Sequence, residues 1–222
     1  MSPKLKAYHA DLLDMNKRVI IAMGLCLTGK TAQAVSCGMS ELQNGYYDKL
    51  VLVREPLVAK CGCLKGDYRT KMAPYTKQAE TYMANESQNS FEEMLEMGRV
   101  EVSEPIFLQG NRFKRQFVIC DEAQNIHKRD TFKIMSRVDE GCKLVIVGDI
   151  SRGQENSRIK IEDSMPYYLY NKLKDSKELA EYVGIHTFYD KENDILGDDF
   201  CKLMINALYD DFVGNVDDII KL

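Results

Sequence analysis

This 222-residue sequence lacks the apolar segments that would insert a protein into a membrane or direct its export. No apolar run approaches the roughly 18 to 20 residues that a bilayer-spanning helix needs. Residues 1–14 mix charged with apolar side chains and lack the apolar core of a signal peptide. We therefore expect a soluble, cytoplasmic protein with no membrane partner.

Patterns typical of a disulfide framework or of a zinc site are also missing. The seven cysteines are odd in number, and several lie in segments that we expect to be strands or helices. Cys61-Gly62-Cys63 lacks the two-residue spacer of common metal sites and has no matching second pair. We expect reduced thiols, and we expect the isolated His9, His127 and His186 to serve the surface or the core.

An excess of positive charge is lacking as well. The chain has 30 Lys and Arg against 34 Asp and Glu, a net charge of −4, which excludes a surface that binds nucleic acid over its whole extent. Short basic groups remain at 112–115, 128–129 and 152–160. Within the first, Phe113 could stack on a base, although any of these groups could instead be a solvated face balanced by acids.

What is present begins with a phosphate-binding loop, G-x-x-x-x-G-K-T, between an apolar run and a helix-permissive run. Its glycines allow a tight turn whose backbone N–H groups face a phosphate, and the following helix offers its positive end. Lys30 supplies charge to the β- and γ-phosphates, and Thr31 offers a hydroxyl to Mg²⁺. We expect ATP and Mg²⁺ as cofactors, with the nucleotide held by Gly24, Leu25, Cys26, Leu27, Thr28, Gly29, Lys30 and Thr31.

A second element is the apolar run Phe117–Cys120, which ends in Asp121-Glu122. Asp121 at the carboxyl end of a strand can hold the Mg²⁺ shell, and Glu122 can polarise an attacking water. The pair could instead cap the next helix, but its place downstream of a phosphate loop favours the catalytic interpretation.

A third apolar run, Lys143–Val147, ends in Gly148-Asp149. Ligands of open parallel sheets lie beyond the carboxyl ends of the strands, so Asp149 should face the same nucleotide. We expect Asp149, with Arg152, to sense the γ-phosphate; alternatively Gln154 reaches back to it.

Alternation of apolar strands with helices predicts an α/β fold with a doubly wound parallel sheet, in one domain spanning 1–222. A helical insertion is expected at 72–98, and a final helix at 198–212. The other elements that we expect are strands at 18–23, 49–54, 117–120, 143–147 and 184–188, extended pieces at 100–103 and 106–109, and helices at 30–43, 128–138 and from about 167.

With these motifs in place, the chain resembles the PhoH family of P-loop ATPases, single-domain relatives of superfamily 1 helicases with a RecA-like fold, in a short phage or bacterial form. The resemblance rests on an ordered series of segments: Gly24–Thr31, Leu52–Pro56, Gly66-Asp67, Pro74-Tyr75, Gly110-Asn111-Arg112, Ile119–Asn125, Ser136-Arg137 and Gly148–Ser151. It departs from the family near the N-terminus, where no glutamine precedes Tyr8 to recognise adenine, and this leaves base preference open.

The resemblance implies ATP hydrolysis coupled to RNA or DNA, in the host cytoplasm if a phage encodes the chain. It implies nucleic-acid contacts at Arg54 and Arg112, beside which Phe113 would lie. It also implies self-association into a ring, six subunits in related proteins, in which Arg112 or Arg137 completes a neighbour's catalytic site. A salt bridge from Arg137 to Asp139 or Glu140 is the alternative.

Two other functions remain open at this point. A thymidine-type nucleoside kinase also joins a phosphate loop to an Asp-Glu-Ala-Gln strand, but such kinases carry a four-cysteine zinc site that this chain lacks. A nucleotide-gated binding module with little turnover is the second. Phosphate release from ATP with RNA, DNA or deoxynucleosides separates all three.

Overall fold

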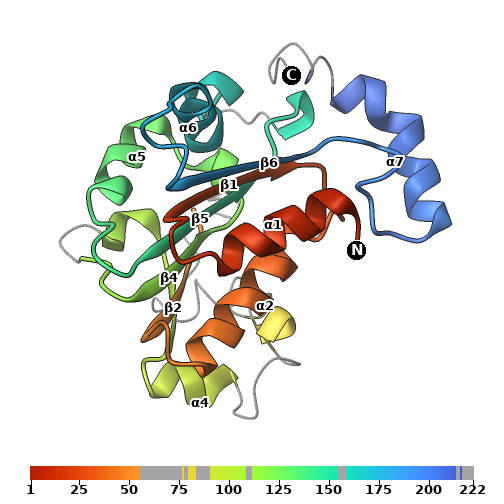
Figure 1. Cartoon of the computed structure of the whole chain (residues 1–222). Coiled ribbons are helices and arrows are strands. Elements are labelled where there is room, and N and C mark those ends of the chain that lie inside the picture. The colour runs from red at the N-terminus through yellow and green to blue at the C-terminus, as the bar shows by residue number, and fades with distance from the viewer. Residues whose placement is uncertain are drawn as a thin grey trace, which may run out of the picture.

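A computed structural model describes residues 1–55, 77, 80–83, 91–108, 112–154, 159–213 and 216 (Figure 1). Within them, helices (α), strands (β) and 3-10 turns (η) follow in the order α1 (Pro3–Leu13), β1 (Val19–Gly24), α2 (Lys30–Gln43), β2 (Lys49–Val53), α4 (Phe91–Glu96), β3 (Val100–Ser103), η1 (Pro105–Leu108), β4 (Gln116–Cys120), η2 (Ala123–Asn125), α5 (Lys128–Met135), β5 (Lys143–Gly148), η3 (Arg152–Gln154), η4 (Ile161–Asp163), α6 (Met165–Leu173), β6 (Val183–Phe188) and α7 (Asp199–Phe212).

The strands form one six-stranded sheet in the order β3-β2-β4-β5-β1-β6, and each neighbouring pair is parallel. β5 therefore lies between the phosphate-loop strand β1 and the Asp-Glu strand β4. The carboxyl ends of all these strands meet at one edge, so the loops after β1, β4 and β5 open on the same side. The predicted α/β class with a parallel sheet is confirmed.

Helices cover both faces of the sheet (Figure 1). α1 and α2 pack on one face, and α6 packs against β1 and β5 on the other. Along β1, Ile20 and Ala22 join the core on the α2 side, whereas Ile21 and Met23 join the core on the α6 side. Successive strand side chains point to opposite faces, so a strand buried on both faces is an uninterrupted apolar run. Within the described residues, no helix combines the length and apolar character needed to cross a membrane.

The N-terminal helix α1 was not expected from the sequence. The Ser2 hydroxyl caps it by accepting a hydrogen bond from the N–H of Leu5, and Leu5, Tyr8 and Leu12 share its buried face. The buried Lys143 ammonium donates to three carbonyl oxygens in the last turn of α1 and just after it. Lys143 is a strand residue far along the chain, so the anchoring of α1 depends on tertiary contacts.

Several predicted boundaries need correction. We expected an extended piece at 106–109, but residues 106–108 belong to the 3-10 turn η1. This turn begins at Pro105, because the proline ring sets a φ angle that suits a helical turn. α5 ends at Met135 rather than 138, and α6 begins at Met165 rather than 167. The expected insertion is helical at 77, 80–83 and 91–96, and 97–98 form a turn. Its other residues, Cys61-Gly62-Cys63 and the family segments at 66–67, 74–75 and 110–111 lie outside the described residues.

Candidate nucleotide site

The phosphate loop joins β1 to α2 and has the tight turn that its sequence predicts. A Cβ atom at Gly24 would clash with the backbone of Phe188 on the neighbouring strand, so only glycine fits there. Gly29, the N-cap of α2, has φ +81°, a left-handed conformation that glycine adopts without strain. Leu27 is also left-handed, with φ +57°. The loop side chains Cys26–Thr31 line a cavity of about 480 Å³, a volume typical of ligand sites.

Lys30 is buried within this loop, with 8% of its surface exposed. Its ammonium donates to the carbonyl oxygens of Gly24 and Leu25, and to the Thr28 hydroxyl at 2.8 Å. Burial lowers the pKa of Lys30 to about 8, against the opposing effect of the nearby Asp149 carboxylate. A triphosphate in the cavity would meet a desolvated cation.

We expect nucleotide affinity to fall as the pH rises from 7 to 9. Lys30 loses its proton in this range, whereas a phosphate beside it favours the charged form, so binding takes up a proton above pH 8. The loss should approach about tenfold per pH unit above pH 8, the limit for linkage to one proton. Titrations with a non-hydrolysable ATP analogue measure this effect. Lys30→Arg, which keeps its charge, should show a flat profile, and equal wild-type affinity at pH 7 and 9 would contradict the prediction.

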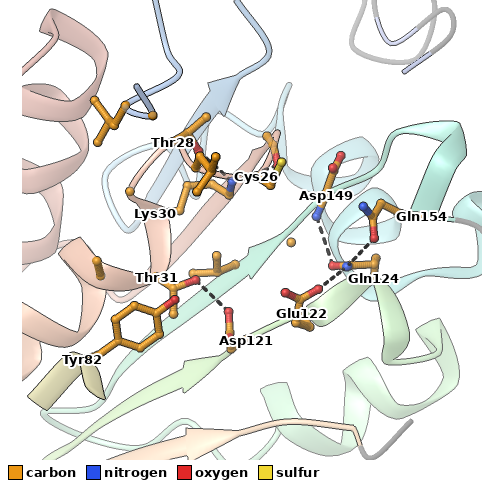
Figure 2. A pocket seen from close by; sticks show the side chains of 18 residues that line it. Cys26, Thr28, Lys30, Thr31, Tyr82, Asp121, Glu122, Gln124, Asp149 and Gln154 are labelled. Carbon is orange, nitrogen blue, oxygen red and sulfur yellow. Dashed lines mark hydrogen bonds between the residues drawn. The ribbon is translucent and has the colours of Figure 1, made fainter. Parts of the chain in front are cut away.

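The two residues expected to bind the metal, Thr31 and Asp121, lie side by side. The Thr31 hydroxyl donates to Asp121 Oδ1 at 2.8 Å, although the two residues are 90 positions apart (Figure 2). Burial raises the pKa of Asp121, opposed by the Arg54 guanidinium 3.7 Å away and by the Thr31 hydrogen bond. A hydroxyl and a carboxylate oxygen at the phosphate loop are ligands that Mg²⁺ prefers, with phosphate oxygens and water completing its shell. These residues therefore fit the expected metal.

Glu122 follows in a left-handed conformation, with φ +50°. One carboxylate oxygen lies 3.5 Å from Arg54 Nη2, and the other accepts a hydrogen bond of 2.6 Å from Gln124 Nε2. The carboxylates of Asp121 and Glu122 thus both lie beside Arg54, which follows the adjacent strand β2. The sequence assigned Arg54 to nucleic acid and contained no signal for this contact.

Asp149 lines the cavity, and other protein groups donate hydrogen bonds to one oxygen of its carboxylate. Oδ1 accepts from the Ser151 N–H and the Tyr189 hydroxyl, and burial raises the pKa of the acid. Its backbone N–H donates to Gln124 Oε1 (Figure 2). In this arrangement Asp149 Oδ1 holds the following loop in place.

Of the two residues expected to contact a γ-phosphate from that loop, Gln154 lines the cavity and Arg152 does not. Both side chains are exposed. The alternative in which Gln154 reaches back toward the nucleotide is the one that the geometry favours.

The remaining predicted residues lie away from the cavity. Phe113 is 2% exposed and pairs with Val138, so stacking on a base at this position is wrong for this arrangement. The Arg112 side chain is 79% exposed and lies 3.4 Å from Asp139. Arg137 makes no salt bridge with Asp139 or Glu140 among these described residues, and its Nε is buried without a hydrogen-bond partner.

The cavity also contains residues that the sequence did not identify: Tyr82, Gln124, Leu196 and Gly197. The sequence contained a signal for Gln124, because it lies in the segment Ile119–Asn125 and its carboxamide can donate and accept hydrogen bonds. Leu196 precedes α7, and its N–H donates to the Leu27 carbonyl. No sequence signal marked this contact between segments far apart in the chain.

A family model described as PhoH-like protein matches residues 2–208. The PhoH-like protein of Bacillus subtilis (strain 168) is 29% identical over 137 residues, 60% of this chain and 43% of that protein. Protein PhoH of Escherichia coli (strain K12) is 28% identical over 142 residues, 62% of this chain and 40% of that protein. The chain therefore spans less than half the length of these relatives.

A solved structure with a related arrangement is the Pyrococcus furiosus Hef helicase domain. Its TM-score is 0.46 with 14% sequence identity, over 82% of this chain and 37% of that chain.

Proposed function

Because this chain belongs to the PhoH family, we propose that it hydrolyses ATP with Mg²⁺ and acts on single-stranded RNA or DNA as a homo-oligomer. The observation that carries the proposal is the 2.8 Å hydrogen bond between the Thr31 hydroxyl and Asp121, beside Lys30 and Glu122 in one cavity. Phosphate binding, metal binding and proton transfer need these groups within reach of one another.

The residues divide the reaction between them. Backbone N–H groups of 24–31 and the N-terminus of α2 bind phosphate oxygens, and Lys30 neutralises charge at the β- and γ-positions. Thr31 and Asp121 hold Mg²⁺, which when bound supplies charge stabilisation to the transferring phosphoryl group. Glu122 accepts a proton from the attacking water. Gln154, which lines the cavity, contacts the γ-phosphate.

Phosphate release measured with purified protein tests this function. ATP turnover that rises with single-stranded RNA or DNA supports it. Phosphate transferred to a deoxynucleoside would instead establish a kinase, and tight ATP binding with negligible release would establish a nucleotide-gated binding module. Parallel assays with GTP, CTP and UTP determine the base preference.

Substitutions at Arg54 and Arg112 should reduce the response to nucleic acid more than basal ATP binding. The Arg112 side chain is exposed, so a nucleic-acid phosphate can reach it. Arg54 follows the end of β2 and lies beside Asp121 and Glu122. Each contact to a nucleic-acid phosphate should appear as a shallower salt dependence of binding in the alanine variant, by about one unit of log–log slope. Binding that is insensitive to salt and to both substitutions would count against this surface. Arg54→Ala should also slow turnover, because it removes a charge beside Glu122.

We expect a neighbouring subunit to complete the site. Lys30 is the only Lys or Arg among the residues that line the cavity in the described part of the chain, and related ATPases add an arginine from a second subunit. Arg112 and Arg137 are the candidates, within a ring for which the family resemblance favours six copies. Mixing Lys30→Ala with Arg112→Ala subunits should restore part of the activity, since some interfaces then carry both intact partners. Full activity of a strictly monomeric protein at every concentration would refute assembly.

A further inference from the structure

The side chain of Gln124 joins three segments at the wall of the cavity. It lies in η2, two residues after Glu122, and only 3% of its surface is exposed. Its Nε2 donates to Glu122 Oε2 at 2.6 Å and to Gln154 Oε1 at 3.3 Å. Its Oε1 accepts the Asp149 N–H at 3.1 Å. Figure 2 shows these contacts converging on one carboxamide.

A carboxamide suits this position because it carries two donor hydrogens and an acceptor on one rigid plane. Both hydrogens and the oxygen are used here. A carboxylate would keep the acceptor but lose both donors and place a like charge beside Glu122. The approach is also close, since a Cβ atom at Gly148 would lie 3.0 Å from Gln124 Oε1.

The two sides of the Glu122 carboxylate therefore have different partners. Arg54 approaches one oxygen from β2 at 3.5 Å, and Gln124 holds the other. Because Gln124 also bonds the backbone of Asp149 and the side chain of Gln154, the orientation of Glu122 is linked to the loop after β5. Gln154 lines the nucleotide cavity, so this loop can contact a ligand held there.

We propose that Gln124 is a positioning residue that orients the Glu122 carboxylate for water activation and links this orientation to the Asp149–Gln154 loop. The inference rests on the proposed ATPase function. Gln124 acts through Glu122, and no bond to the nucleotide is assigned to it.

Gln124→Met, which keeps the side-chain length but removes every polar atom, tests the proposal together with Gln124→Glu. Both variants should bind a non-hydrolysable ATP analogue within about threefold of wild type, while kcat falls about 10- to 100-fold, as a misoriented catalytic group would cause. Gln154→Ala should lower kcat less and combine non-additively with Gln124→Met.

Gln33→Met is the matched control, because Gln33 is a partly buried glutamine that bonds His9 and lies outside the cavity lining. It should keep wild-type kcat. If wild type turns over ATP and both Gln124 variants retain kcat, the positioning role is overturned. A lowered melting temperature and lost binding, with unchanged turnover per bound nucleotide, would also overturn it by showing a structural role.

Hydrogen exchange at the Asp149 amide separates this inference from the proposed function. Gln124→Met should accelerate exchange there, whether or not wild type hydrolyses ATP, because the amide loses its acceptor. A wild type without turnover overturns the ATPase function alone. Unchanged exchange at Asp149 overturns the link through Gln124.

Discussion

Lys30→Ala should abolish ATP turnover and weaken triphosphate binding by at least about tenfold. Among the described residues that line the cavity, Lys30 is the one Lys or Arg, and the variant removes its charge. Hydrogen bonds from a charged donor to phosphate are stronger than those between neutral groups. Loss of a preorganised charge at the transferring group typically costs about 100-fold or more in rate. Phosphate release and analogue titration, both at pH 7, measure the two effects.

Lys49→Ala is the control for this substitution. Lys49 begins β2 at the opposite edge of the sheet from the loops and pairs with the Glu101 carboxylate at 3.0 Å, so its loss removes a lysine without touching the cavity. It should leave turnover unchanged. Hydrolysis by Lys30→Ala at the wild-type rate would contradict the proposal that the phosphate loop serves ATP hydrolysis.

Glu122→Gln should retain ATP and stall hydrolysis. The amide keeps the shape of the carboxylate but cannot accept a proton from water, and general-base catalysis typically contributes about 10²- to 10⁴-fold. Affinity for MgATP should stay within about threefold, because Lys30, Thr31 and Asp121 are intact. Single-turnover hydrolysis and equilibrium binding on the same preparation separate the two effects.

Glu101→Gln provides the corresponding control for a carboxylate that pairs with a cation away from the cavity. It should affect neither measurement. A parallel fall of binding and turnover in Glu122→Gln would mean that Glu122 holds the metal or the fold instead of activating water.

The local chemistry of the site was readable from the sequence because it depends on short segments. The glycines at 24 and 29, the lysine and threonine that follow, and a carboxylate after an apolar run each specify their own turn or strand end. Burial on both faces makes the strands continuous apolar runs, which is why β1, β4 and β5 could be placed to within about a residue. The predicted meeting of Thr31 with Asp121 follows from parallel strands sharing one carboxyl edge.

Contacts between strand ends depended on the order of strands, which no local pattern encodes. The adjacency of β2 and β4 brings Arg54 beside Asp121 and Glu122, and that of β4 and β5 brings Gln124 to the Asp149 amide. Phe113 has an aromatic ring of the kind that stacks on bases, yet it is buried where its backbone forms a β-bridge with Val138.

The sequence by itself determined the α/β class, the phosphate loop and the carboxylate that follows β4, because glycine geometry, strand burial and ligand chemistry act within a few residues. The tertiary structure alone decided three things: that Lys143 anchors α1, that Gln154 rather than Arg152 faces the cavity, and that Gln124 bridges two loops. These outcomes join residues tens to more than a hundred positions apart. Hydrogen bonds over such separations form only after the sheet has brought its strands into order.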